Sequence, residues 1–190
     1  MRCRREEFVE GAIFHIYNHS VDEIDLFFED EDYIYFLNKF KKNFNHKEFE
    51  IYAYCLMPNH FHFCIKQNLS NPIYEIFNKT CISYVHHFNS KYKRKGKLFA
   101  NKLQHKKVKR DDYLIQLCKY IHYNPVKAGL VEELKDWEFS NYLDFTNQRD
   151  GTLFSHELFS MYPDEFNNYK ERIIEYEKYL DEEQFKEILF

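Results

Sequence analysis

The sequence has little glycine and little proline, with four residues of each among 190. Scarce turn formers argue against long disordered tracts, and the length allows one ordinary domain with a hydrophobic core and a terminal appendage. We therefore expect a domain over residues 1–145, followed by an acidic, α-helical extension over residues 146–190.

Cysteine is sparse and shows no paired rhythm. There are five cysteines, an odd number without CxxC spacing: Cys3, Cys55, Cys64, Cys81 and Cys118. This pattern argues against a disulfide framework and against a zinc knuckle.

Apolar runs are also short, since none approaches the roughly 18 residues of a membrane span, and the first residues lack the apolar core of a signal peptide. We expect a soluble protein of the reducing cytoplasm without a membrane partner.

Acidic and basic residues are separated along the chain. The net charge of −4 does not by itself suggest a nucleic-acid partner, yet residues 91–110 contain no acid at all, and the sequence from Gly151 onward is acidic. A local electropositive face is compatible with the acidic total. The basic segment is either a solvated hairpin or a surface that contacts phosphates. Its candidate residues are Lys91, Lys93, Arg94, Lys95, Lys97, Lys102, Lys106, Lys107, Lys109 and Arg110.

Hydrophobic periodicity predicts the element order β, α, β, β, α, β, α. The expected strands span residues 11–20, 48–58, 60–67 and 98–110, and the expected helices span residues 32–44, 71–93 and 111–124. Pro125 should end the third helix, because the residue before proline resists helical geometry. The order predicts an α+β fold of the ferredoxin-like or RRM-like kind: a split βαβ antiparallel sheet with its helices packed on one face, plus a helical C-terminal tail.

Two histidines stand one residue apart in the third expected strand, within LMPNHFHFCI. Residues two apart on a strand share a face, so His60 and His62 point to one side and Phe61 and Phe63 to the other. Such a pair can hold a metal ion, since imidazole suits zinc, manganese, iron or copper and suits magnesium less naturally. A structural role for the two histidines is the alternative that the pattern alone leaves open.

A phenol and an amide share one side of the third expected helix. Tyr113, Gln116, Tyr120 and Asn124 recur three to four residues apart, which brings their side chains together along the helix. The alternative is a half-buried tyrosine with a satisfied hydroxyl and an asparagine that caps the helix before the proline. The spacing alone does not choose between a site and these structural roles.

Three stretches, in this order and at these separations, resemble the REP-associated tyrosine transposases and their insertion-sequence relatives, the single-tyrosine HUH endonucleases. They are AYCLMPNHFHFCI, FNSKYKRKGKLF and YLIQLCKYIHYNPVKAGLV, and FHIYNHSVDEIDLFFEDEDYIYFL resembles the opening segment of that family. The resemblance covers residues 10–145. The chain departs from the family pattern in WEFSNY, where only Ser140 of a common serine pair is present, and at Lys102, where an arginine is common.

The resemblance implies a metal-dependent enzyme that cuts and rejoins single-stranded or hairpin DNA through a covalent 5′-phosphotyrosine. It implies Tyr120 as the nucleophile, and His60, His62 and Asn124 as ligands of a divalent ion, Mg²⁺ or Mn²⁺. The basic residues would follow the DNA backbone. Two alternatives stay open: a nucleic-acid-binding regulator on the same fold that does not cut, and a phosphodiesterase that acts through bound water. The resemblance is compatible with a monomer and with a homodimer.

Overall fold

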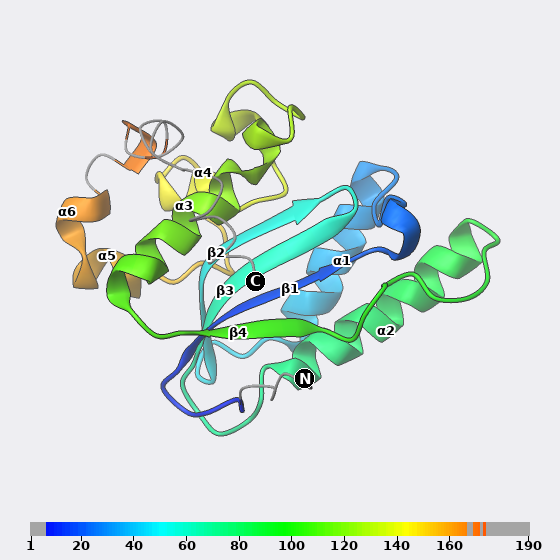
Figure 1. Ribbon diagram of the computed structural model, residues 1–190, viewed down its shortest axis with the longest axis horizontal. Coiled ribbons are helices and arrows are strands. Elements are labelled where there is room, and N and C mark those ends of the chain that lie inside the picture. Colours follow the sequence, from blue (N-terminus) through cyan, green and yellow to red (C-terminus); the bar gives the residue numbers. More distant parts are fainter. Residues whose placement is uncertain (1–6, 167–168, 172, 174–190) are drawn as a thin grey trace, which may run out of the picture.

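The computed structural model describes residues 7–166, 169–171 and 173, and its fold confirms the predicted α+β class. Four antiparallel strands form one sheet in the order β2-β3-β1-β4 (Figure 1). The strands are β1 (Ile13–His19), β2 (Phe49–Met57), β3 (His60–Gln67) and β4 (Gln104–Val108). Because β3 lies between β1 and β2, and β1 lies between β3 and β4, two βαβ units interleave as the split plan requires.

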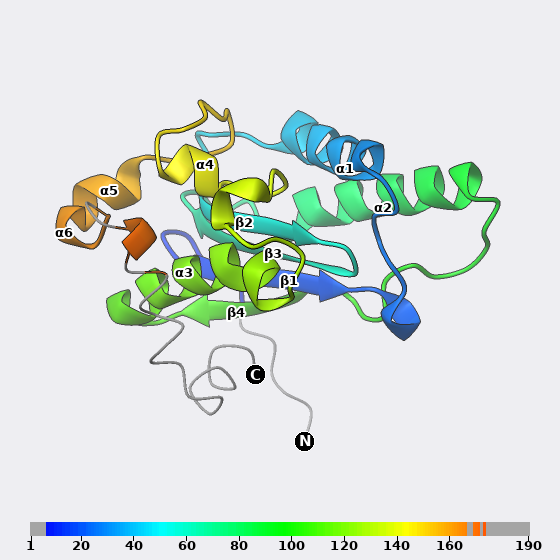
Figure 2. The same ribbon diagram turned by 90° about the horizontal axis from the view of Figure 1, so that it is seen from above.

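Helices cover both faces of the sheet. One face packs against α1 (Asp30–Asn43) and α2 (Tyr74–Lys91), and the other packs against α3 (Asp111–Lys127), as Figure 2 shows. The expectation that the helices pack on one face holds for α1 and α2 and is wrong for α3. The reason is visible in β2 and β3, which are buried over almost their whole length and therefore have no polar face to leave uncovered.

Each face of the sheet has its own hydrophobic core. Phe61 and Phe63 point toward α1 and α2, as the strand alternation predicts. The ring centroid of Phe63 lies 4.9 Å from that of Phe40 on α1 and 5.1 Å from that of Phe77 on α2. Cys64, the next residue of β3, packs in the core under α3. The histidines of β3 alternate with the phenylalanines, so they face α3.

The helix α3 runs through its proline. It ends at Lys127 with Pro125 inside, so the expectation that Pro125 ends the helix is wrong. A proline this close to the C-terminus removes a single backbone donor, and the last turn still closes, since the Ala128 amide donates to the Asn124 carbonyl at 2.9 Å. Gly129 then ends the helix at a φ of 68°, a left-handed conformation that glycine adopts without strain.

The fourth expected strand is shorter than predicted. Only Gln104–Val108 form β4, and the segment before it pairs with the end of β1, where the Ala100 amide donates to the His19 carbonyl at 3.1 Å. The end of the segment that precedes β4 therefore lies beside the end of β1.

The chain that follows α3 covers the outer edge of the sheet. The Leu56 amide of β2 donates to the Phe139 carbonyl at 2.9 Å, and the Asn141 amide donates to the Tyr54 carbonyl at 3.2 Å. These bonds protect a strand edge that would otherwise offer unpaired backbone groups.

The described part of the C-terminal region contains three short helices joined by turns and irregular segments. They are α4 (Tyr142–Phe145), α5 (Glu157–Met161) and α6 (Pro163–Phe166). The division at residue 145 stays a prediction. Cys3 and residues 167–168, 172 and 174–190 of the expected helical tail lie outside the described residues. In the part of the chain that is described, no helix combines the length and the apolar character that crossing a bilayer requires.

Candidate active site

The end of the sheet under α3 gathers aromatic and imidazole side chains. In the register of β1 and β3, Tyr17 lies opposite His62 and His19 lies opposite His60, so the four residues occupy adjacent positions on one face. The ring centroids of His60 and His62 are 5.0 Å apart. The two histidines are therefore neighbours, as their spacing predicts.

The helix α3 brings Tyr120 to the same end of the sheet. Its ring centroid lies 5.4 Å from that of His62, edge-on at 74°, and its side chain is only 5% exposed. Leu117 and Ile121 are fully buried beside it and hold the helix against the sheet. The phenol and the histidine pair therefore meet within one chain.

Asn124 follows Tyr120 by one helical turn and is also buried. Its Nδ2 donates to the carbonyl of Tyr120 at 2.8 Å. This bond occupies the amide nitrogen, so the amide oxygen is the atom that Asn124 can offer to a cation or a hydroxyl group. One turn before Tyr120, Oε1 of Gln116 is buried without a hydrogen-bond partner. The helix thus carries an amide side chain one turn to either side of the phenol.

Both histidines of β3 have the same ring nitrogen left over. Nδ1 of His60 donates to Oδ1 of Asn59 at 2.6 Å, since an amide oxygen can only accept. Nδ1 of His62 lies 3.0 Å from Nε2 of His15, a fully buried residue of β1. Nε2 is therefore the nitrogen that His60 and His62 each have for an ion.

The donor set fits a divalent ion. Two imidazole nitrogens and an amide oxygen are ligands that Mn²⁺ and related ions accept. Among the residues that the structure describes, no three histidine, cysteine or carboxylate side chains are grouped so as to hold a metal. Further ligands would have to be an amide oxygen, water or a substrate oxygen, and such an open coordination shell is typical of catalytic sites.

Burial sets the protonation of these groups. It lowers the pKa of His60 to about 4, with a smaller contribution from His19. It lowers the pKa of His62 well below the ordinary value, with contributions from His15 and His60. Neutral imidazole is the form that binds metals, so the pair is in that form at neutral pH. Burial also raises the pKa of Tyr120, so its phenol keeps its proton until its anion is stabilised.

The basic residues differ in how they are engaged. Lys91 is ion-paired with Asp32 at 2.8 Å and with Glu29, so a phosphate would have to displace two acids from it. The other predicted residues lie in the segment between α2 and β4, on β4, or just before α3. They are Lys93, Arg94, Lys95, Lys97, Lys102, Lys106, Lys107, Lys109 and Arg110.

A hollow of about 320 Å³ opens beside the histidine pair. It is lined by Tyr17, Asn18, His19, Ser20, Glu23, Asn59, His60 and His62. Nδ2 of Asn18 donates to the Asn101 carbonyl at 3.2 Å, which ties this wall to the basic segment between α2 and β4. The hollow therefore lies beside Asn101, at the end of the basic segment that precedes β4.

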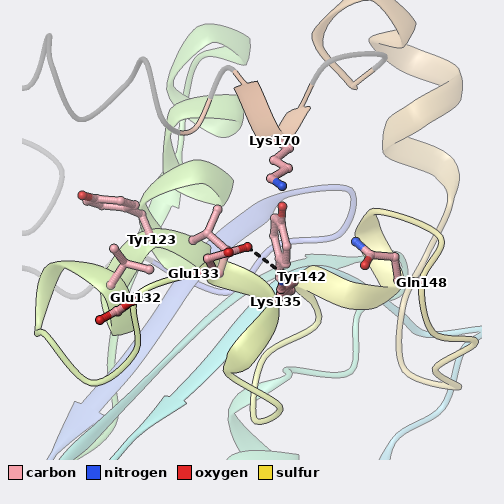
Figure 3. A pocket seen from close by; sticks show the side chains of 9 residues that line it. Tyr123, Glu132, Glu133, Lys135, Tyr142, Gln148 and Lys170 are labelled. Carbon is pink, nitrogen blue, oxygen red and sulfur yellow. Dashed lines mark ion pairs between the residues drawn. The ribbon is translucent and has the colours of Figure 1, made fainter.

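A second hollow, of about 370 Å³, lies near the C-terminal end of α3. Figure 3 shows Lys170 pointing toward Tyr142, and the ion pair of Glu133 and Lys135, at 2.9 Å, on the same wall. Its lining carries both signs of charge and includes none of the predicted site residues. The first hollow is therefore the better candidate for DNA.

A buried polar network that the sequence analysis missed ties α3 to β2. Oδ1 of Asn141 accepts from the Tyr54 amide at 2.6 Å and from Nε2 of His122 at 2.9 Å, and Nδ2 of Asn141 donates to the Tyr52 carbonyl at 3.1 Å. The other nitrogen of His122 then accepts from the hydroxyl of Tyr169 at 2.9 Å. The network holds the helix that carries the predicted nucleophile.

Removing this network should destabilise the fold. We expect Asn141→Ala to lower the free energy of unfolding by about 3 kcal/mol, because it leaves several buried donors and acceptors without partners. Urea denaturation followed by circular dichroism measures the loss. Asn43→Ala, at an exposed position of α1, is the control and should stay within about 0.5 kcal/mol of the unmodified protein. Equal small losses in both variants would contradict this role of Asn141.

Comparisons with known proteins find similar sequences and a similar fold. A family model described as "Transposase IS200 like" matches residues 11–124. A putative REP-associated tyrosine transposase of Haemophilus influenzae is 30% identical over 123 residues, which cover 58% of this chain and 69% of that protein. A solved structure of a REP-associated tyrosine transposase bound to a REP hairpin shares the fold with a TM-score of 0.66, at 16% identity, over 82% of this chain and 98% of that one.

The split βαβ sheet and the family match define the class of protein as a DNA-acting transposase. The chain belongs to the IS200-like transposase family. The resemblance to REP-associated tyrosine transposases that the sequence motifs indicate is thereby confirmed.

Proposed function

We propose that this protein is a metal-dependent endonuclease and strand transferase for single-stranded DNA, with Tyr120 as its nucleophile. The observation that carries the proposal is the convergence of Tyr120 on His60 and His62 in one chain. Membership of a transposase family supports it, and so does a solved relative with the same fold that is bound to hairpin DNA.

The reaction follows from the phenol. The oxygen of Tyr120 attacks the phosphorus of a phosphodiester, loses its proton, and displaces the 3′ oxygen, which takes up a proton. The products are a 5′-phosphotyrosine and a free 3′ hydroxyl group. A 3′ hydroxyl of another strand can then attack the phosphotyrosine, which restores the phenol and joins the DNA. Because Tyr120 is only 5% exposed, water has little access to the intermediate, and this favours joining over hydrolysis.

The other predicted site residues would bind the metal ion, and the packing of α3 orients the phenol. A divalent ion, Mg²⁺ or Mn²⁺, would be held by His60, His62 and Asn124, and would neutralise the scissile phosphate and stabilise the phenolate. The buried face of α3 fixes the position of Tyr120, so its phenol needs little further movement to reach the phosphorus after the DNA binds. A phosphate that enters between the helix and the sheet must be locally unpaired, so the proposed substrate is single-stranded or hairpin DNA.

The exposed lysines between α2 and β4 should contribute to the salt dependence of DNA binding. We expect the triple variant Lys93→Gln, Lys95→Gln and Lys97→Gln to reduce the slope of log K against log salt by about 2, since each single-strand phosphate contact contributes about 0.7. Fluorescence anisotropy with a labelled hairpin, over roughly 50 to 200 mM salt, measures the slope. The double variant Lys41→Gln and Lys42→Gln, at exposed positions of α1, should leave it unchanged. An unchanged slope in the triple variant would show that these three lysines do not contact the DNA phosphates.

The proposal is tested by searching for a covalent adduct. The protein is incubated with Mn²⁺ and a labelled library of single-stranded hairpins, and the products are separated under denaturing conditions. We expect a labelled band that survives SDS. Binding without cleavage would favour the regulator, and cleavage without an adduct would favour a phosphodiesterase that uses bound water.

A further inference from the structure

His15 shares the sheet face of the histidine pair but is not one of the predicted ligands. It is fully buried, and its Nε2 lies 3.0 Å from Nδ1 of His62, with the ring centroids 5.1 Å apart. Its other nitrogen, Nδ1, is buried and has no hydrogen-bond partner. Buried polar groups usually have their hydrogen bonds satisfied. Among the described residues, His62 is therefore the one hydrogen-bond partner of the His15 side chain, and the role of His15 depends on that bond.

The bond between two neutral imidazoles has two arrangements, because each ring carries one N–H. In the first, Nδ1 of His62 donates to Nε2 of His15, and Nε2 of His62 has a free lone pair. In the second, Nε2 of His15 donates to Nδ1 of His62, and the proton of His62 then sits on Nε2, where it blocks an ion. Only the first arrangement allows His62 to bind a metal through Nε2.

The surroundings of His15 favour a neutral ring held in one orientation. Lys106 of β4 lies directly opposite His15 in the register with β1, so a positive charge on His15 would be repelled as well as desolvated. Tyr17 packs against the ring, with centroids 4.8 Å apart, and limits its rotation. Nε2 of His15 is thus held toward His62.

We propose that His15 is a positioning residue that holds His62 in the tautomer and orientation that bind a divalent ion through Nε2. The inference rests on the proposed function, since it takes His62 as a ligand. Metal-binding histidines commonly give their second N–H to an acceptor, and loss of that acceptor typically costs 10- to 100-fold in metal affinity. A carboxylate in this position would offset part of the charge of the ion. The neutral imidazole of His15 leaves that charge for the phosphodiester.

Two variants separate this role from mere packing. His15→Leu keeps much of the volume and removes the acceptor, whereas His15→Gln keeps an amide oxygen that can reach the position of Nε2. Each protein, free of DNA, is titrated with MnCl₂ by calorimetry, and its melting temperature is measured without metal. We expect the leucine variant to bind Mn²⁺ about 10- to 100-fold more weakly and the glutamine variant to lie within about threefold of the unmodified protein. A packing role would shift the melting temperatures and leave the Mn²⁺ affinities equal.

A second measurement does not depend on either variant folding. Long-range ¹H–¹⁵N NMR of the unmodified protein, labelled at histidine and loaded with diamagnetic Zn²⁺, reports which nitrogen of His62 carries the proton. We expect the proton on Nδ1. A proton on Nε2, or equal Mn²⁺ affinity in a folded leucine variant, would overturn the role of His15 and leave the proposed function standing. Failure of the unmodified protein to bind Mn²⁺ would overturn both.

Discussion

Tyr120→Phe is expected to abolish the SDS-stable adduct and to lower hairpin cleavage by at least about 10⁴-fold, the scale seen when an enzyme loses its nucleophile. The substitution removes one oxygen and keeps the ring, which packs edge-on against His62 at 5.4 Å. Folding and DNA affinity should therefore stay close to those of the unmodified protein. The rate is measured on a labelled hairpin with Mn²⁺, and DNA affinity is measured by anisotropy on the same hairpin.

Tyr123 provides the matched control for this substitution. It lies on the same helix and is 6% exposed, close to the 5% of Tyr120, but it lines the hollow of Figure 3 and not the histidine site. Tyr123→Phe should cut and form the adduct at nearly the unmodified rate. If Tyr120→Phe keeps cutting, the phenol is not the nucleophile and water is the better candidate.

His60→Ala should have the second largest effect, with cleavage reduced by at least about 10³-fold and Mn²⁺ affinity by more than about 100-fold. The variant loses one of the two imidazoles that present Nε2. His60 is more exposed than His62, so the fold should tolerate its loss. Calorimetry with MnCl₂ and single-turnover cleavage measure the two effects.

His19→Ala is the control for His60→Ala. His19 lies opposite His60 in the sheet and is exposed, but it is not a proposed ligand. Its loss should change Mn²⁺ affinity only slightly. A loss as large as that of His60→Ala would mean that His19 takes part in holding the ion.

A mixing experiment tests whether one chain supplies the whole site. Tyr120→Phe and His60→Ala are combined in equal amounts, and cleavage of the hairpin is measured. Because Tyr120 lies against His62 of its own chain, and His62 lies beside His60, we expect no recovery of activity. Recovery well above that of either variant alone would show that a homodimer shares its sites between chains.

Much of the fold can be predicted from local patterns. Alternation of apolar residues locates the strands, helical spacing locates α1 to α3, and the order of the elements indicates the split sheet. The face that His60 and His62 share follows from the period of a strand, and the common side of Tyr120 and Asn124 follows from the period of a helix. These relations hold within one element, so no tertiary information is needed to find them.

The parts that were missed depend on relations between elements. Periodicity shows that one side of α3 is buried but does not say which face of the sheet buries it. A single histidine on an apolar strand has no spacing that distinguishes it, and His15 meets His62 only because β1 and β3 pair in one register. Asn141 is 87 residues from Tyr54 in the sequence, and its Oδ1 accepts a hydrogen bond from the Tyr54 amide. Its position beside Ser140, where the chain departs from the family pattern, was the available hint.

In the proposed reaction, the phenol of Tyr120 becomes joined to the 5′ phosphate of cut DNA. The most direct test is to digest the adduct with trypsin and nuclease and to locate the remaining nucleotide by tandem mass spectrometry. We expect a 5′-linked nucleotide on Tyr120 in the peptide that contains residues 120–124. A nucleotide on another residue, or one linked through its 3′ end, would contradict it.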